Sequence, residues 1–120
     1  WDEESKNLEF PYAEFGMTGL ETTFSVCRTF LDKHLSINAL VEKLSLAPRR
    51  VLGLPAPEIR PGVRAELTLF DPDAEWVFGE KDIRSRSRNT PFISRPFKGK
   101  VLGIVGNWLD PQRLELETAQ

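Results

Sequence analysis

The stretch "LPAPEIRPG", residues 54–62, separates two parts of the sequence that have different hydrophobic patterns. Its three prolines exclude a helix, because proline lacks the backbone N–H donor and its ring clashes with the preceding helical turn. Before this proline stretch apolar residues recur at helical spacing, and after it they alternate as they do in β-strands. The sequence therefore predicts an α/β protein in which helices precede strands, without repeated alternation of the two.

Three helices are predicted before the proline stretch. Thr18 and Glu21 have the spacing of a capping box, in which a hydroxyl and a carboxylate each accept a free N–H at a helix start, so we expect a helix over residues 19–33. A second helix should begin after Ser36, a common N-cap residue type. A third, short helix is expected over residues 45–52, and the glycine that follows should end it.

The strands are predicted after the proline stretch. Residues 66–70 alternate as a strand, an Asp-Pro-Asp turn follows at 71–73, and two more strands are expected over residues 76–78 and 99–107. Neither part buries its apolar residues alone, because the helices lack a partner for one face and the short strands leave open sheet edges. We therefore expect the chain to pack against a larger remainder of its own protein.

Composition restricts the function. The chain has 120 residues, a formal net charge of −2, one cysteine and one histidine. A single cysteine forms no internal disulfide, and one cysteine with one histidine makes no Cys/His zinc cluster. No apolar run reaches the roughly 18–20 residues of a membrane helix, and the acidic start "WDEESKNLEF" is unlike a signal peptide. We expect a cytoplasmic protein without a membrane partner.

Individual titratable residues give no catalytic pattern. His34 ends the first predicted helix, where a cation favours the helix dipole, and Cys27 lies on its apolar face as a structural thiol. Glu9 and Glu14 belong to a polar loop and Glu21 already has a capping role. We therefore assign no catalytic or metal-binding role to these side chains.

The segment "RSRSRN", residues 84–89, has the composition of a phosphate-binding arm. A nucleic-acid-binding domain is normally basic as a whole, however, whereas this chain has a net negative charge. We expect a loop whose arginines bond neighbouring backbone or carboxylate groups, and no nucleic-acid partner.

The segment "EFGMTG", residues 14–19, is the best candidate for ligand contact. Gly16 and Gly19 permit backbone conformations and close approaches that side chains prevent. Free amides at the following helix start attract carboxylates and other anions. Many glycine-containing helix entries are only turns, so the pattern alone leaves both interpretations open.

Five blocks in fixed order give the chain a family resemblance, from residue 11 to residue 105. They are "EFGMTGLETTF", "EKLSLAPRRVLGLP", "IRPGVRAELTLFDPDAEWVF", "RSRSRNTPF" and "FKGKVLGIV". Together they resemble the C-terminal quarter of bacterial dihydroorotases of the amidohydrolase superfamily. Hydantoinases, dihydropyrimidinases and allantoinases share the later blocks, and "FGMTGLET" favours dihydroorotase. The tail after Val105 does not follow the family pattern.

The resemblance implies a fold and two domains. Dihydroorotases have a metal-dependent (β/α)8 barrel and a composite β-sandwich. Residues 1–54 would be the loop after the eighth barrel strand and the last barrel helices, and residues 55–120 would be the C-terminal segment of the sandwich. The resemblance implies that the remainder of the barrel is the chain's main packing partner, and it is compatible with a homodimer.

The resemblance also implies a reaction. Dihydroorotase reversibly hydrolyses the cyclic amide of dihydroorotate to N-carbamoyl-L-aspartate in pyrimidine biosynthesis, using zinc and a catalytic aspartate. That aspartate would lie just upstream of Trp1 and the zinc ligands earlier still, so no catalytic or metal residue is expected in this chain, which alone should be inactive. Only substrate binding carries over, to Phe15 and Gly16, largely through backbone atoms.

Two other functions remain open at this point. One is a related cyclic amidase, such as a dihydropyrimidinase, hydantoinase or allantoinase. The other is a dihydroorotase-like scaffold without catalysis that binds aspartate carbamoyltransferase. A free-standing binding module is a weaker hypothesis, because both halves of the chain look unfinished.

Overall fold

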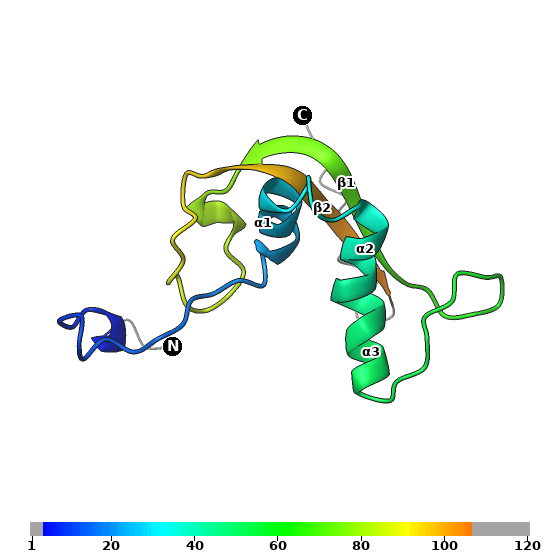
Figure 1. Cartoon of the computed structure of the whole chain (residues 1–120), viewed down its shortest axis with the longest axis horizontal. Coiled ribbons are helices and arrows are strands. Elements are labelled where there is room, and N and C mark those ends of the chain that lie inside the picture. The colour runs from blue at the N-terminus through cyan, green and yellow to red at the C-terminus, as the bar shows by residue number, and fades with distance from the viewer. Residues whose placement is uncertain (1–3, 107–120) are drawn as a thin grey trace.

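The computed structural model describes residues 4–106, and its helices precede its strands. The elements in order are η1 (Glu4–Lys6), α1 (Thr23–Phe30), α2 (Ile37–Val41), η2 (Glu42–Leu46), α3 (Ala47–Val51), β1 (Glu66–Val77), η3 (Glu80–Asp82) and β2 (Pro96–Gly106) (Figure 1). The prediction of an α/β chain with helices first is confirmed at this level. The tail beyond residue 106 lies outside the described residues.

Helix α1 is shorter than predicted, and the predicted capping box is wrong. The helix spans Thr23–Phe30, and Thr22 precedes it without a side-chain cap bond. The turn before it is closed by backbone bonds from the N–H groups of residues 22 and 23 to Gly19 O, at 3.1 and 2.8 Å. Instead, the Thr18 hydroxyl donates to Asn89 O and the Glu21 carboxylate accepts from the N–H groups of residues 84 and 85, so distant backbone groups outcompete the local ones.

The second and third predicted helices are one continuous helical run, residues 37–51, which we call the second helical stretch (Figure 1). Ser36 Oγ accepts a hydrogen bond from Ala39 N at 3.2 Å, so the predicted cap is confirmed. The π-helical segment η2 precedes Pro48, whose ring would clash with a carbonyl of a regular helix; the wider turn relieves that clash. Gly53, at φ 66°, follows the helical end.

Strands β1 and β2 form a two-stranded antiparallel sheet, in which Glu66 pairs with Gly106 and Val77 with Pro96. The two strands predicted before residue 79 are one strand, so that part of the prediction is wrong. The predicted turn survives as an irregularity of register between Asp71 and Glu75, where Asp71 Oδ1 accepts bonds from the next backbone N–H groups. Pairing resumes beyond it because β2 is long enough to meet both segments.

The core lies where α1 packs against the sheet. Phe78 and Phe97 are 1% and 3% exposed, and the rings of Phe24 and Phe70 lie 4.8 Å apart. Ser25 Oγ donates a 2.6 Å hydrogen bond to the carbonyl of Gly99, which has a φ of 85°. A Cβ at this glycine would lie 2.8 Å from Arg28 Cγ, so the close approach of helix and strand requires glycine.

The second helical stretch leaves much of its apolar surface uncovered. Leu40 is buried, at 4% exposed, whereas Leu44 and Val51 are 42% and 86% exposed.

Across residues 4–106, no helix has both the length and the apolar character needed to cross a membrane.

Candidate functional site

The predicted ligand-contact segment, residues 14–19, is an exposed loop that we call the glycine loop. It connects the N-terminal turn η1 to the region of α1 (Figure 1). The Phe15 side chain is 91% exposed. Gly16 has a φ of 105°, in a region that residues with side chains adopt only under strain. The loop therefore presents an aromatic ring beside a backbone shape that depends on glycine.

Lys6 fixes the orientation of the peptide between Phe15 and Gly16. Its Nζ donates a 2.8 Å hydrogen bond to Phe15 O, and it also bonds to Glu14 O. In a planar trans peptide the C=O and N–H point in opposite directions, so the Gly16 N–H points away from Lys6. Among residues 4–106 this N–H meets no acceptor. It is a backbone donor that is available to a ligand.

Residues 84–89, which we call the arginine loop, hold the other side of the glycine loop (Figure 1). Asn89 Nδ2 donates a 2.7 Å hydrogen bond to Gly16 O. Asn89 O accepts bonds from Thr18 N at 2.9 Å and from Thr18 Oγ1 at 3.2 Å. Asn89 therefore forms hydrogen bonds with the residues on both sides of Met17 in the glycine loop.

Glu21 joins the same two segments at a second point. Its Oε1 accepts hydrogen bonds from Arg84 N at 3.0 Å and from Ser85 N at 2.6 Å. Partial burial acts to raise the pKa of Glu21, but hydrogen bonds from the Ser85 side chain and from the backbone of residues 21, 84 and 85 outweigh it and lower the pKa. The carboxylate is thus stabilised in its charged form, which suits a structural acceptor better than a proton donor.

Every second residue of the arginine loop is half-buried, and the sequence did not predict that two of these residues bond to Glu21 and Gly16. Ser85, Ser87 and Asn89 are half-buried, whereas Arg84, Arg86 and Arg88 are exposed. The expected contact with a carboxylate occurs at Arg88, whose Nη1 lies 3.8 Å from Glu80 Oε2. The strict alternation of arginine with small polar residues was the available signal, because extended chains direct successive side chains to opposite sides.

The other sequence candidates are not brought together. His34 is exposed, and Cys27 is half-buried with a free thiol. Glu9 and Glu14 are exposed in the N-terminal segment. Within residues 4–106, no three His, Cys, Asp or Glu side chains are grouped so that they could hold a metal ion. The described part of the chain therefore does not fit a zinc site.

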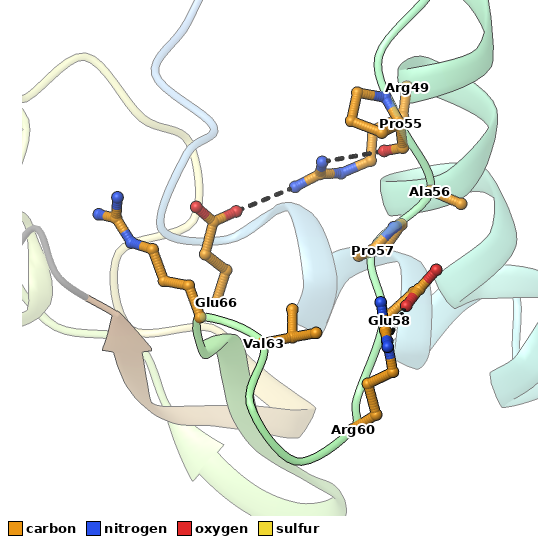
Figure 2. Close-up of a pocket in the computed structure, with 9 residues that line it drawn as sticks. Arg49, Pro55, Ala56, Pro57, Glu58, Arg60, Val63 and Glu66 are labelled. Carbon is orange, nitrogen blue, oxygen red and sulfur yellow. Dashed lines mark hydrogen bonds and ion pairs between the residues drawn. The ribbon is translucent and has the colours of Figure 1, made fainter.

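An open groove of about 350 Å³ lies between α3, the proline stretch and the start of β1 (Figure 2). Its two glutamates each pair with an arginine. Arg49 lies 3.5 Å from Glu66 and donates to Pro55 O at 3.4 Å, and Arg60 pairs with Glu58. It shares no residue with the glycine loop, so it is not continuous with that loop.

Curated proteins that resemble this chain include dihydroorotases from several bacteria. The chain is 46% identical over 97 residues to the dihydroorotase of Chlorobaculum tepidum, with 79% of this chain covered. It is 39% identical over 98 residues to that of Syntrophus aciditrophicus, and 36% identical over 106 residues to that of Clostridium acetobutylicum, with 81% and 87% of this chain covered. No family model matches the chain.

The structure defines an α/β unit in which a helix packs on an antiparallel pair of strands, with a clamped glycine loop before the helix. By its sequence, the chain belongs to the dihydroorotase family. It spans about a quarter of the length of the curated relatives it matches, between 22% and 25% of the three named above. The family resemblance expected from the five sequence blocks is confirmed.

Proposed function

We propose that the chain is the C-terminal portion of a zinc-dependent dihydroorotase. The intact protein would reversibly hydrolyse the cyclic amide of dihydroorotate to N-carbamoyl-L-aspartate, a step of pyrimidine biosynthesis in the cytoplasm. The observation that carries this proposal is the 46% identity to a dihydroorotase over 79% of the chain. In this proposal the catalytic aspartate and the zinc ligands precede Trp1, and zinc supplies the activated water.

The role of this chain in that reaction is substrate binding by the glycine loop. The Gly16 N–H would donate a hydrogen bond to a carboxylate or ring carbonyl of the substrate. A backbone donor is suited to this task because its direction is set before the substrate arrives, here by Lys6 on Phe15 O and by Asn89 on Gly16 O. The exposed Phe15 ring would cover the bound ring and exclude water.

The architecture of the intact protein is also a proposal. Residues 1–54 would complete a (β/α)8 barrel and residues 55–120 a β-sandwich. The uncovered apolar side chains of the second helical stretch, among them Leu44 and Val51, support a missing packing partner in the barrel. A homodimer is compatible with the same surfaces.

The proposal is tested on the full-length protein that contains this chain. The residues encoded immediately before Trp1 should include an Asp-His-Ala-Pro motif or a close variant. The purified protein should contain zinc and turn over dihydroorotate but not dihydrouracil. Turnover of dihydrouracil alone would assign a dihydropyrimidinase, and a protein that contains no zinc, does not turn over and binds aspartate carbamoyltransferase would be a scaffold.

The glycine loop is tested separately by Gly16→Val. At a φ of 105° valine is strained, and its side chain would occupy the approach to the N–H. We expect a rise in KM or loss of turnover while the zinc content stays unchanged. Wild-type kinetics would remove the glycine loop from the site without affecting the assignment of the family.

A further inference from the structure

We propose that Asn89 and Glu21 are positioning residues that hold the glycine loop in its substrate-binding shape. This inference rests on the proposed function of that loop. Neither side chain needs to touch the substrate, because both act through the backbone of the two loops. The observation behind it is a set of hydrogen bonds between segments that are 63 to 73 residues apart in the sequence.

Asn89 is suited to the task because it offers a donor and an acceptor in one residue. Its side-chain Nδ2 donates to Gly16 O, while its backbone O accepts from the N–H and hydroxyl of Thr18. Both peptide planes around Met17 are therefore fixed by one partner. An aspartate in its place would set a negative oxygen against the Gly16 carbonyl, and the bond would become a repulsion.

Glu21 prevents the arginine loop from moving away with Asn89. Its Oε1 binds the N–H groups of residues 84 and 85, at the opposite end of the loop from Asn89. The arginine loop is thus tied at its first and last residues to the segment that carries the glycine loop. Either tie alone would leave one end of the arginine loop free to swing.

The ties lower the conformational entropy that substrate binding would otherwise have to remove. Gly16 lies in an exposed loop, and glycine has more accessible backbone conformations than any other residue. Ordering such a loop during binding weakens affinity, whereas a loop that is ordered beforehand binds without that cost. Loss of a tie should therefore act on KM more than on kcat.

The first experiment compares Asn89→Asp with wild type in the full-length protein. We expect KM for dihydroorotate to rise about tenfold, the usual scale for one lost or reversed polar contact, and kcat to stay within about twofold. Zinc content should not change. If Asn89→Asp fails to fold, Thr18→Val removes only the hydroxyl that reaches Asn89 O, and a smaller rise in KM is expected.

The second experiment compares two substitutions of Glu21, one that keeps an acceptor oxygen and one that removes it. Glu21→Gln keeps an oxygen that accepts from both N–H groups, so KM should stay close to wild type. Glu21→Ala removes the acceptor and should raise KM about as much as Asn89→Asp, on the same physical grounds. Equal KM values for the two variants would overturn the role of Glu21.

A matched control distinguishes positioning from general stability. Asp73→Asn weakens ion pairs with Arg28 and Lys98 at the contact of α1 with the sheet, which lies outside both loops. Its urea midpoint should fall while KM remains that of wild type. A rise of KM in this control equal to that of Asn89→Asp would show that KM reports stability alone, and would overturn the inference.

The outcome also distinguishes this inference from the function on which it rests. If Gly16→Val abolishes turnover but Asn89→Asp has wild-type KM, only the positioning role fails. If Gly16→Val is kinetically silent, the binding role of the glycine loop fails, and the positioning role fails with it.

Discussion

Helix α1 and the second helical stretch differ in how completely this chain covers them. Helix α1 meets the sheet through Phe24, which packs on Phe70, and through Ser25, which donates a hydrogen bond to Gly99 O. In the second helical stretch Leu40 is buried, while Val51 is 86% exposed. The contact of α1 with the sheet covers the facing side chains of both elements. The second helical stretch has apolar side chains that no part of the described chain covers.

The difference shows how to distinguish a locally complete contact from an unfinished one. At the contact of α1 with the sheet, polar groups pair as fully as apolar groups: Thr29 Oγ1 accepts from Lys98 N at 2.9 Å, and Arg28 Nη2 lies 3.1 Å from Asp73. Such matched pairing requires that both partners be present. The second helical stretch has apolar side chains without that matching surface, which agrees with the proposal that it packs against the rest of the protein.

The largest expected effect comes from filling the closest approach. In Gly99→Val, the new side chain would lie where a Cβ is already 2.8 Å from Arg28 Cγ and 3.1 Å from Phe24 Cε1, at a φ of 85°. Overpacking and backbone strain together should lower the free energy of unfolding by about 4 kcal/mol. Urea denaturation of the intact protein measures this loss. Gly103→Val is the control, since a Cβ there meets no atom within 4 Å.

The next effect tests the aromatic contact itself. Phe24→Ala removes the ring that lies 4.8 Å from Phe70, and because Phe24 is half-buried the loss of unfolding free energy should be about 2 kcal/mol. Thermal and urea denaturation measure the change. A loss below about 0.5 kcal/mol, the usual range of surface substitutions, would contradict a complete contact of α1 with the sheet.

A smaller effect tests whether the second helical stretch is covered in the intact protein. Val51→Ser at a solvent-exposed site should change the unfolding free energy by no more than about 0.5 kcal/mol. Because we propose that the remainder of the protein covers this face, we expect Val51→Ser to lower the unfolding free energy by about 1–2 kcal/mol, the scale for burial of a valine side chain. Lys43→Ser, at an exposed position of the same stretch, is the control. A silent Val51→Ser would show that this face stays exposed in the intact protein, and would contradict the proposed packing partner.

The smallest effect concerns pH and the two loops. The pKa of Glu21 is lower in the folded protein than its ordinary value of 4.5, so its ionised form stabilises the fold. That contribution is present above pH 4.5 and is lost as the pH falls through the lowered pKa. The difference in stability between wild type and Glu21→Gln should therefore shrink as the pH falls below 4.5. A difference that grows with acidification would contradict the lowered pKa.

Local sequence rules succeeded where one element determines its own shape. The cap at Ser36, the exclusion of helix by the proline stretch and the position of β2 follow from side-chain chemistry and periodicity within a few residues. They failed at Thr18 and Glu21, where the capping-box spacing was correct but the oxygens bond to residues 84–89. Sequence spacing accounts for hydrogen-bond partners that are near in the sequence, and it does not account for partners that folding brings close from far away in the sequence.

The candidate site shows the same limit. The glycines predicted a special backbone shape at residues 14–19, and Gly16 adopts one. Lys6 and Asn89 were not predicted, because they reach the loop by bonds that no spacing within the loop encodes. The roles of Phe15 and Gly16 in substrate binding remain predictions.

The sequence by itself determined the order of helices and strands, the helix start at Ser36 and the family. Propensity and periodicity are properties of neighbouring residues, and the order of the five blocks is read directly along the chain. Only the tertiary structure decided that β1 is one irregular strand, that α1 approaches the sheet at Gly99, and that Asn89 and Glu21 join two loops. The physical reason is that a hydrogen-bonding group selects its partner by distance in space, and folding brings residues such as 16 and 89 within 2.7 Å of each other.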